Sequence, residues 1–247
     1  MIVLKLGGSV ITDKDRAETL DGEALERAAD AVADARRTGE TESLVLVHGG
    51  GSFGHVNASE HGVSTTEGTH DPGAVAAIHG AMKTLNGFVL QRLLDRNVPA
   101  VPVHPFSAAH RDERGTLHLP TGQLETLCSE GFVPVLHGDL VAHTGAGATV
   151  VSGDELVVEV ARGLEADRIG LCSTVPGVLD ADDEVVERIG SYEEVAAVLG
   201  ESESTDVTGG MAAKVRALLA LESRASIFGL DELAAFLAGE AVGTTLE

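Results

Sequence analysis

Short apolar runs rich in β-branched residues alternate along the chain with longer segments of helical composition. The short runs are typical of strands buried on both faces, and the longer segments are typical of helices with one apolar face. This alternation predicts an α/β fold with a largely parallel central sheet. The predicted strands are 2–4, 44–47, 100–103, 132–136, 168–171 and 225–228, and the predicted helices are 22–32, 74–94, 155–163 and 211–221.

Two further stretches, 109–120 and 142–150, contain Gly and polar residues, and we expect hairpins or loops that decorate the sheet. The chain has 247 residues, of which 43% are hydrophobic, and it shows neither an internal repeat nor a low-complexity tract. It can therefore bury one substantial core. We expect a single domain built as two lobes that share a sheet.

Glycines follow directly after two of the predicted strands. Residues 2–6 run into Gly7-Gly8, and residues 44–47 run into the segment HGGGSFGH at 48–55. Open parallel sheets bind ligands beyond the carboxyl ends of their strands, and glycine lets backbone N–H groups approach a phosphate without a Cβ in the way. The first pair also fits a plain turn. The triple glycine of the second segment is predicted to bind an anion, because a flexible linker would not directly follow an apolar strand.

A third glycine pair, Gly209-Gly210, leads into a predicted helix that carries Lys214 one turn inside. A helix N-terminus offers free N–H groups and the positive end of the helix dipole. The chain has only four lysines, and three of them, Lys5, Lys14 and Lys214, lie in or beside the glycine motifs. Lysines scattered over a surface would rarely give this distribution, so it predicts phosphate handling. The Walker A pattern GxxxxGK[ST] does not occur, and the phosphate site must use another scaffold.

The net charge of −22 comes from 39 acidic against 17 basic residues. Such a chain repels nucleic acids and anionic membranes, so a small molecule is the expected partner. The acid-rich, lysine-poor composition also suggests a salt-loving source. In molar salt the Debye length falls to about 3 Å, and repulsion between surface carboxylates is largely screened. An ordinary acidic protein is the alternative interpretation.

Cysteine and histidine usage indicates neither a disulfide framework nor a metal site. Cys128 and Cys172 form no closely spaced pair, and the ten histidines show no HExxH or other close ligand spacing. The apolar start at 1–4 is interrupted by Lys5, and no run of about 18 apolar residues occurs. We therefore expect a cytoplasmic protein in a reducing compartment, with no resident metal.

Taken together, the glycine and lysine motifs resemble those of the amino acid kinase superfamily, and within it those of kinases that act on isopentenyl phosphate. The resemblance covers nearly the whole chain. His55 narrows the choice, because related kinases of carboxylates or of UMP lack a histidine closing this loop, whereas kinases of isopentenyl phosphate and of fosfomycin have it. The matching segments are KLGGS at 5–9, Asp13-Lys14, HGGGSFGH at 48–55, His137-Gly138-Asp139, Ser152-Gly153-Asp154, Pro176-Gly177-Val178, DVTGGMxxK at 206–214 and Gly-Glu-x-x-Gly-Thr at 239–244.

The resemblance implies a three-layer α/β sandwich of amino acid kinase type over residues 1–247, with a substrate lobe at about 1–165 and a nucleotide lobe at about 166–247. It implies transfer of the γ-phosphoryl group of ATP to isopentenyl phosphate, with Mg²⁺ arriving with ATP. It also implies a homodimer. Bringing two anions together requires charge neutralisation and in-line alignment, which agrees with lysines placed beside glycine loops.

Carried over by motif, Lys5 and Lys214 would hold the ATP phosphates and Lys14 would stabilise the transferring group. His55 would donate a hydrogen bond to the acceptor phosphate. A general base is unnecessary, because a phosphate monoester is already ionised near neutral pH. Asp154 would orient Lys5 and Lys214 from between them. Its place just before the predicted helix also fits a helix N-cap, and both roles are compatible.

The same resemblance assigns the remaining contacts. The helix at 74–94 has an apolar face that is core by default, but the family comparison places part of it near the isoprenoid tail. Thr174 stands where relatives usually have an aspartate, so the nucleotide loop departs from the pattern there. The nucleotide would contact Leu6, Gly7, Gly8, Ser9, Gly51, Thr174 and Gly209, the acceptor phosphate would contact Gly50 and Gly153, and the tail would contact Ile78, Met82, Leu140 and Val150.

Three other functions remain open at this point. A fosfomycin-type phosphonate kinase would share every phosphate motif but would need a smaller and more polar acceptor pocket. Acetylglutamate or UMP kinase activity is disfavoured by His55. A catalytically silent nucleotide-sensing module is disfavoured because all three candidate lysines are retained.

Overall fold

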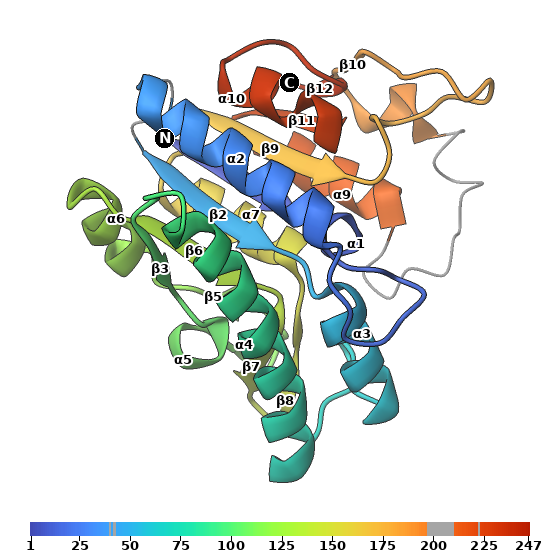
Figure 1. Ribbon diagram of the computed structural model, residues 1–247. Helices are drawn as coiled ribbons and strands as arrows, with labels where there is room; N and C mark the ends of the chain where they lie inside the picture. The colour runs from blue at the N-terminus through green and yellow to red at the C-terminus, as the bar shows by residue number, and fades with distance from the viewer. Residues whose placement is uncertain (40, 42, 197–209, 222) are drawn as a thin grey trace.

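The central element of the fold is an eight-stranded sheet with the strand order β10-β12-β11-β9-β1-β2-β6-β3 (Figure 1). The computed structural model describes residues 1–39, 41, 43–196, 210–221 and 223–247. Each strand pair of this sheet is parallel except β11–β12, which is antiparallel. The strands are β1 (Ile2–Leu6), β2 (Leu44–His48), β3 (Ala100–Pro102), β6 (Val133–His137), β9 (Arg168–Ser173), β10 (Arg188–Ile189), β11 (Arg224–Gly229) and β12 (Thr244–Leu246).

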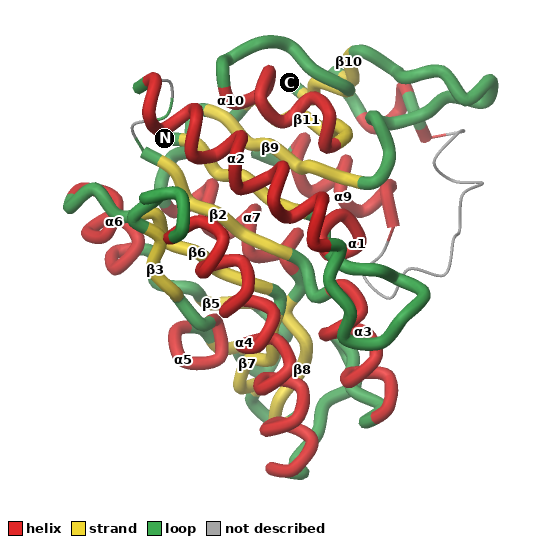
Figure 2. The backbone as a smooth tube through the Cα atoms, viewed as in Figure 1, coloured by secondary structure: helices red, strands yellow, loops and turns green. Residues whose placement is uncertain are grey.

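Helices cover both faces of this sheet, which confirms the predicted three-layer α/β sandwich (Figure 2). Successive residues of a strand point to opposite faces. Leu4 therefore packs in one core with α2, α4 and α10, whereas Val3 packs in a second core with α7 and α9. The helices are α1 (Gly8–Ile11), α2 (Gly22–Thr38), α3 (Gly51–Glu60), α4 (Pro72–Leu94), α5 (Pro105–Ala108), α6 (Gly122–Ser129), α7 (Gly153–Gly163), α9 (Gly210–Leu219) and α10 (Leu233–Leu237).

A smaller sheet with the order β5-β4-β7-β8 lies beside the carboxyl end of β6. The hairpins expected at 109–120 and 142–150 are both present, and they pair with each other through β4 and β7. The second hairpin is longer than predicted because β7 begins immediately after β6. The strands are β4 (His110–Arg111), β5 (Leu117–His118), β7 (Asp139–His143) and β8 (Gly147–Val151).

The ends of the long helices follow from local capping chemistry. Asp21 accepts a hydrogen bond from Ala24 N at the start of α2, and Gly39 ends this helix in the left-handed conformation with φ of 80°. Asp71 caps α4, and Pro72 occupies its first turn, where a missing N–H costs nothing. Within the described part of the chain, no helix combines the length and apolar character needed to span a membrane.

The sequence did not predict α1, α3, α5, α6, α10, β10 or β12. Helix α3 begins inside the triple glycine, whose composition argues against a helix. The last strand, β12, lies between β11 and the edge strand β10, and only tertiary contact reveals so short an element. These additions do not change the fold class.

Candidate active site

The two glycine loops that follow β1 and β2 pack backbone against backbone. A Cβ on Gly8 would lie 2.1 Å from Gly51 N, and a Cβ on Gly49 would lie 2.5 Å from Gly8 N. Thr12 Oγ1 links the loops, because it accepts a hydrogen bond from Ser52 N at 3.0 Å and donates one to Gly8 O at 2.8 Å. Both glycine motifs are therefore needed for close approach, and they meet at one place beyond the carboxyl ends of adjacent strands.

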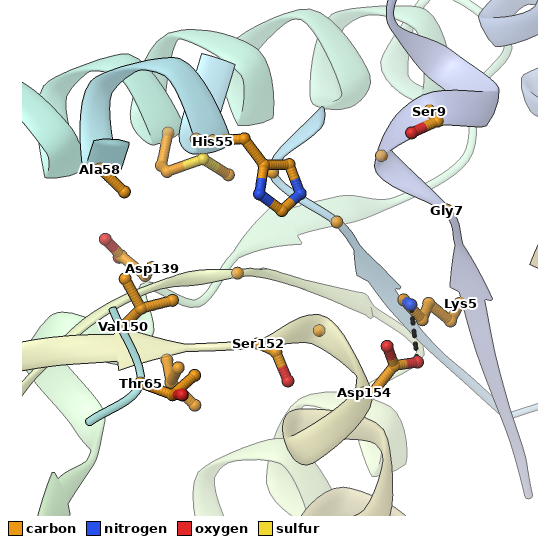
Figure 3. A pocket seen from close by; sticks show the side chains of 18 of the residues that line it. Lys5, Gly7, Ser9, His55, Ala58, Thr65, Asp139, Val150, Ser152 and Asp154 are labelled. Atoms are coloured by element: carbon orange, nitrogen blue, oxygen red, sulfur yellow. Dashed lines mark hydrogen bonds and ion pairs between the residues drawn. The ribbon is translucent and has the colours of Figure 1, made fainter. Parts of the chain in front are cut away.

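One pocket of about 460 Å³ opens at this place, and it is lined by residues from distant parts of the sequence (Figure 3). Phosphate-site candidates from β1, α3, α7 and α9 share its wall with apolar side chains from α4 and β8. The sequence-predicted residues that line it are Lys5, Gly7, Gly8, Ser9, Gly50, His55, Ile78, Met82, Val150, Gly153, Asp154, Thr174 and Lys214.

Five other predicted residues do not line the pocket or lie outside the described part of the chain. Lys14 is exposed in the loop after α1. Leu6, the last residue of β1, is buried in the hydrophobic core. Gly51 lies behind the first glycine loop, in contact with Gly8. Leu140 is fully buried in the small apolar cluster that also contains Ile78. Gly209 falls in the segment 197–209, which is not described.

Asp154 joins two of the predicted lysines. Its Oδ1 lies 2.6 Å from Lys5 Nζ, and its Oδ2 lies 3.9 Å from Lys214 Nζ. The three side chains come from α7, β1 and α9 and are between 11% and 21% exposed. Two ammonium groups and one carboxylate leave a net positive charge at this end of the pocket. Such a group of charges can bind a polyphosphate.

The N-cap interpretation of Asp154 is wrong, because Ser152 caps α7. Ser152 Oγ accepts a hydrogen bond from Glu155 N at 3.1 Å, and Glu155 Oε2 accepts one from Ser152 N at 2.9 Å. This reciprocal pair is a capping box. Asp154 lies within the first turn, and its carboxylate faces Lys5 rather than the helix amides. Gly153 is tightly placed as well, since a Cβ there would lie 3.1 Å from Lys5 Cε.

The other half of the pocket combines an imidazole with an apolar recess. His55 projects from α3 into the pocket and is solvent-exposed (Figure 3). The thioether of Met82 packs over the glycine loop, because Cβ atoms on Gly50 and Gly54 would lie 3.5 and 2.9 Å from its sulfur. The recess beyond it is lined by Ala58, Val63, Ile78, Met82 and Val150. This half can bind an anionic head group attached to a short apolar tail.

Several pocket residues were not predicted as site residues, and two of them, Ser152 and Asp139, belong to motifs noted in the sequence. Ser152 caps the helix that presents Gly153 and Asp154. Asp139 lies in the pocket wall, and burial raises the pKa of its carboxyl group above the usual range. Cys172 also lines the pocket, and burial raises the pKa of its thiol to about 12. Nothing in the sequence indicated that Asp139 lies in the pocket, because a carboxylate is not expected at a site that binds anions.

Comparison with known proteins gives a consistent family. The model of the amino acid kinase family matches residues 1–229. The isopentenyl phosphate kinase of Haloferax volcanii is 59% identical over 246 residues, covering 100% of this chain and 98% of that protein. The isopentenyl phosphate kinase of Methanothermobacter thermautotrophicus is 36% identical over 239 residues, covering 91% and 88%. Among solved structures, an isopentenyl phosphate kinase superposes with a TM-score of 0.85 at 30% identity and covers 100% of both chains.

Proposed function

The chain belongs to the amino acid kinase family, and from this premise we propose that it transfers the γ-phosphoryl group of ATP to isopentenyl phosphate. The products are isopentenyl diphosphate, an intermediate of isoprenoid biosynthesis, and ADP. The observation that carries the proposal is one continuous pocket with the Lys5–Asp154–Lys214 group at one end and His55 beside an apolar recess at the other. That arrangement suits two phosphorylated molecules held end to end.

At the nucleotide end, Lys5 and Lys214 neutralise the ATP phosphates while Asp154 holds both ammonium groups in place. The backbone N–H groups of the loop that contains Gly7, Gly8 and Ser9 add donors without side-chain obstruction. Leu6, Gly51, Thr174 and Gly209 complete the proposed nucleotide contacts. Mg²⁺ is expected to enter with ATP. Among the residues that the structure describes, no group of three or more His, Cys, Asp or Glu side chains is suited to hold a metal ion.

At the acceptor end, His55 donates a hydrogen bond to the phosphate of isopentenyl phosphate, and Gly50 and Gly153 approach it with their backbones. The acceptor oxygen is already ionised near neutral pH, so His55 has no proton to remove. The tail lies against Ile78, Met82, Leu140 and Val150. Burying five carbons at roughly 0.8 kcal/mol each contributes about 4 kcal/mol to binding.

Lys14 is proposed to stabilise the transferring phosphoryl group, although its side chain is exposed outside the pocket wall. The loop that carries it is tied to α3 near the acceptor end, since Thr19 N donates to Ser52 Oγ at 3.3 Å. We propose that a movement of this loop brings the ammonium group toward the two phosphates. Its role therefore depends on a rearrangement when substrates bind.

Several broader assignments are part of the same proposal. Residues 1–165 supply the acceptor end and residues 166–247 complete the nucleotide end, although the eight-stranded sheet runs through both. We expect a homodimer that works in the cytoplasm, where ATP is supplied. The net charge of −22 disfavours nucleic acids and anionic membranes as partners.

A coupled ADP-release assay in roughly molar KCl tests the function directly. Isopentenyl phosphate, dimethylallyl phosphate, fosfomycin, N-acetylglutamate and UMP are offered in turn as acceptors. Turnover of isopentenyl phosphate, with little or none of the last three, is the expected result. Turnover of only fosfomycin, N-acetylglutamate or UMP would overturn the proposal, and ATP binding without turnover of any acceptor would favour a nucleotide-sensing role.

A further inference from the structure

Behind the acceptor end lies a cluster of buried and half-buried titratable side chains that phosphoryl transfer does not use. It contains one carboxylate and several imidazoles, brought together from β2, α4, the segment before α5, β6 and β7. The rings contact one another at centroid distances between 5.2 and 5.8 Å. We call this group the histidine cluster, and its members are His48, His79, His104, His137 and Asp139.

Asp139 is the member that reaches the pocket. Its side chain is fully buried, and Figure 3 shows it between Ala58 and Val150 at the same end of the pocket. The preceding residue, Gly138, lies between the proposed phosphate contacts, because a Cβ there would be 3.6 Å from both Gly50 N and Gly153 N. Gly138 therefore separates these two backbone amides. Asp139, which carries the carboxylate, is the next residue in the chain.

A structural reason explains why a carboxylate is present there. Asp139 Oδ1 accepts a hydrogen bond from Leu140 N at 2.8 Å, and this bond fixes the corner at which β6 turns into β7. Gly138 N donates to His48 O at 2.9 Å, which joins the same corner to β2. An anionic group at this corner nevertheless opposes the binding of a phosphate nearby. Burial increases this repulsion, because the effective dielectric constant is low.

His79 is the imidazole that faces the carboxylate. Its Nδ1 lies 3.0 Å from Oδ1 and 2.9 Å from Oδ2 of Asp139. An ionised carboxylate can only accept hydrogen bonds, so Nδ1 of His79 is the donor. Contact with His79 lowers the pKa of Asp139, in opposition to the larger effect of burial. The pair comes from α4 and β7, two elements that both line the acceptor end.

The other three imidazoles of the cluster make their hydrogen bonds elsewhere, and His48 bonds to Gly49 O and to Asn86 Oδ1. His137 Nδ1 donates to Gly138 O at 2.9 Å, and its Nε2 accepts from His104 Nδ1 at 2.9 Å. Burial lowers the pKa of His137 well below its ordinary value, which agrees with a neutral ring. His137 Nδ1 is also 3.7 Å from Asp139, a distance too long for a hydrogen bond. Among the imidazoles, His79 therefore compensates the carboxylate, together with the backbone N–H groups of Leu140 and Phe106.

We propose that His79 is a positioning residue that holds Asp139 at the β6–β7 corner and offsets its negative charge, so that a phosphate can bind beside Gly138. The inference rests on the proposed acceptor site and adds a residue to it. Loss of the imidazole should weaken acceptor binding about ten-fold, the size expected for one uncompensated buried charge several ångströms from a phosphate. ATP phosphates bind at the far end of the pocket and should be little affected.

The test compares four variants in the full-length protein. His79→Gln removes the imidazole but keeps a hydrogen-bond donor, and His79→Lys places an ammonium group at this position. Asp139→Asn is added to His79→Gln to remove the carboxylate as well. His104→Gln is the matched control, because His104 belongs to the same cluster but donates to His137 rather than to Asp139. The KM for isopentenyl phosphate, the KM for ATP and the thermal midpoint are measured for each.

His79→Gln should raise the acceptor KM about ten-fold with an ATP KM within about two-fold, and the effect should persist in molar KCl because buried charges are poorly screened. His79→Lys and the double variant should return the acceptor KM toward the parent value. The proposal would be overturned if the acceptor KM were unchanged in His79→Gln, or if neither His79→Lys nor the double variant restored it. An equal rise of the acceptor KM in His104→Gln would also overturn it. Calorimetry with inorganic phosphate follows the same variants, so the charge effect is measured even if isopentenyl phosphate is not the acceptor.

Discussion

Lys5 and Asp154 stand 149 positions apart in the sequence and meet at 2.6 Å in the fold. The lysine is the last residue but one of β1, a buried strand near the centre of the sheet, and the aspartate lies in the first turn of the helix that packs on that strand. The second oxygen of the same carboxylate faces Lys214 on α9. One carboxylate thus sets the spacing of two ammonium groups that would otherwise repel each other.

Replacing this carboxylate should impair catalysis. Asp154→Asn removes the charge that holds Lys5 and Lys214, and we expect kcat to fall about 10–100-fold, as for a misplacement of catalytic groups by about 1 Å. Steady-state kinetics measures the change. Glu159→Gln on the same helix is the control, because Glu159 pairs at 2.6 Å with exposed Arg162. Equal losses in the two variants would show that general damage to α7, rather than the lysines, is responsible.

His55 should act on the acceptor and not on the nucleotide. His55→Ala removes a donor to the acceptor phosphate, and we expect kcat/KM for isopentenyl phosphate to fall about 100-fold or more. The Kd for ATP, measured by calorimetry without acceptor, should stay within about two-fold. A parallel loss of ATP affinity would place His55 at the nucleotide end and contradict its assigned role.

Six strands of the central sheet were predictable from sequence because they are largely buried, whereas the short strands β10 and β12 were not. Each of the six is a short continuous apolar run, and the glycines after β1 and β2 indicated where the loops meet. Two aspects of the site were not predictable. The capping box that places Ser152 before α7 competes with an equally reasonable cap at Asp154, and only geometry decides between them. The exposed position of Lys14 depends on the path of a loop, which local sequence does not determine.

Asp139 illustrates a second limit. The motif His137-Gly138-Asp139 was visible in the sequence. The role proposed for its carboxylate depends on His79, a hydrogen-bond partner 60 positions away. His79 lies on a helix whose pattern predicts only an apolar face. The contact between His79 and Asp139 could therefore be recognised only once the structure placed α4 beside β7.

The contact between the glycine loops predicts a large difference between two similar substitutions. Gly8→Ala would place a Cβ 2.1 Å from Gly51 N, so the free energy of unfolding should fall by about 3 kcal/mol or more. Gly22→Ala, at the start of α2, meets no atom within 4 Å and should stabilise the protein by about 0.5–1 kcal/mol. Urea unfolding of both variants measures the difference. A mild effect of Gly8→Ala would show that the loops are not in contact.

Cys172 should make stability fall at alkaline pH. Burial raises the pKa of its thiol from 9.0 to about 12, so between these values the folded protein retains a proton that the unfolded chain has lost. Its contribution is complete below pH 9 and decreases by about 1.4 kcal/mol per pH unit as the pH rises toward 12. Chemical unfolding at several pH values should show a shallower decline for Cys172→Ala. Identical slopes for the parent and the variant would rule out a protonated buried thiol.

The central claim is that two phosphorylated molecules bind end to end between the lysine pair and His55. A crystal structure with isopentenyl phosphate and a non-hydrolysable ATP analogue tests it most directly. The acceptor phosphate should lie within hydrogen-bonding distance of His55, the terminal phosphate of the analogue should contact Lys5 and Lys214, and the reacting atoms should approach to about 3–3.5 Å. An acceptor phosphate bound away from His55, or two phosphates on separate walls of the pocket, would contradict the claim.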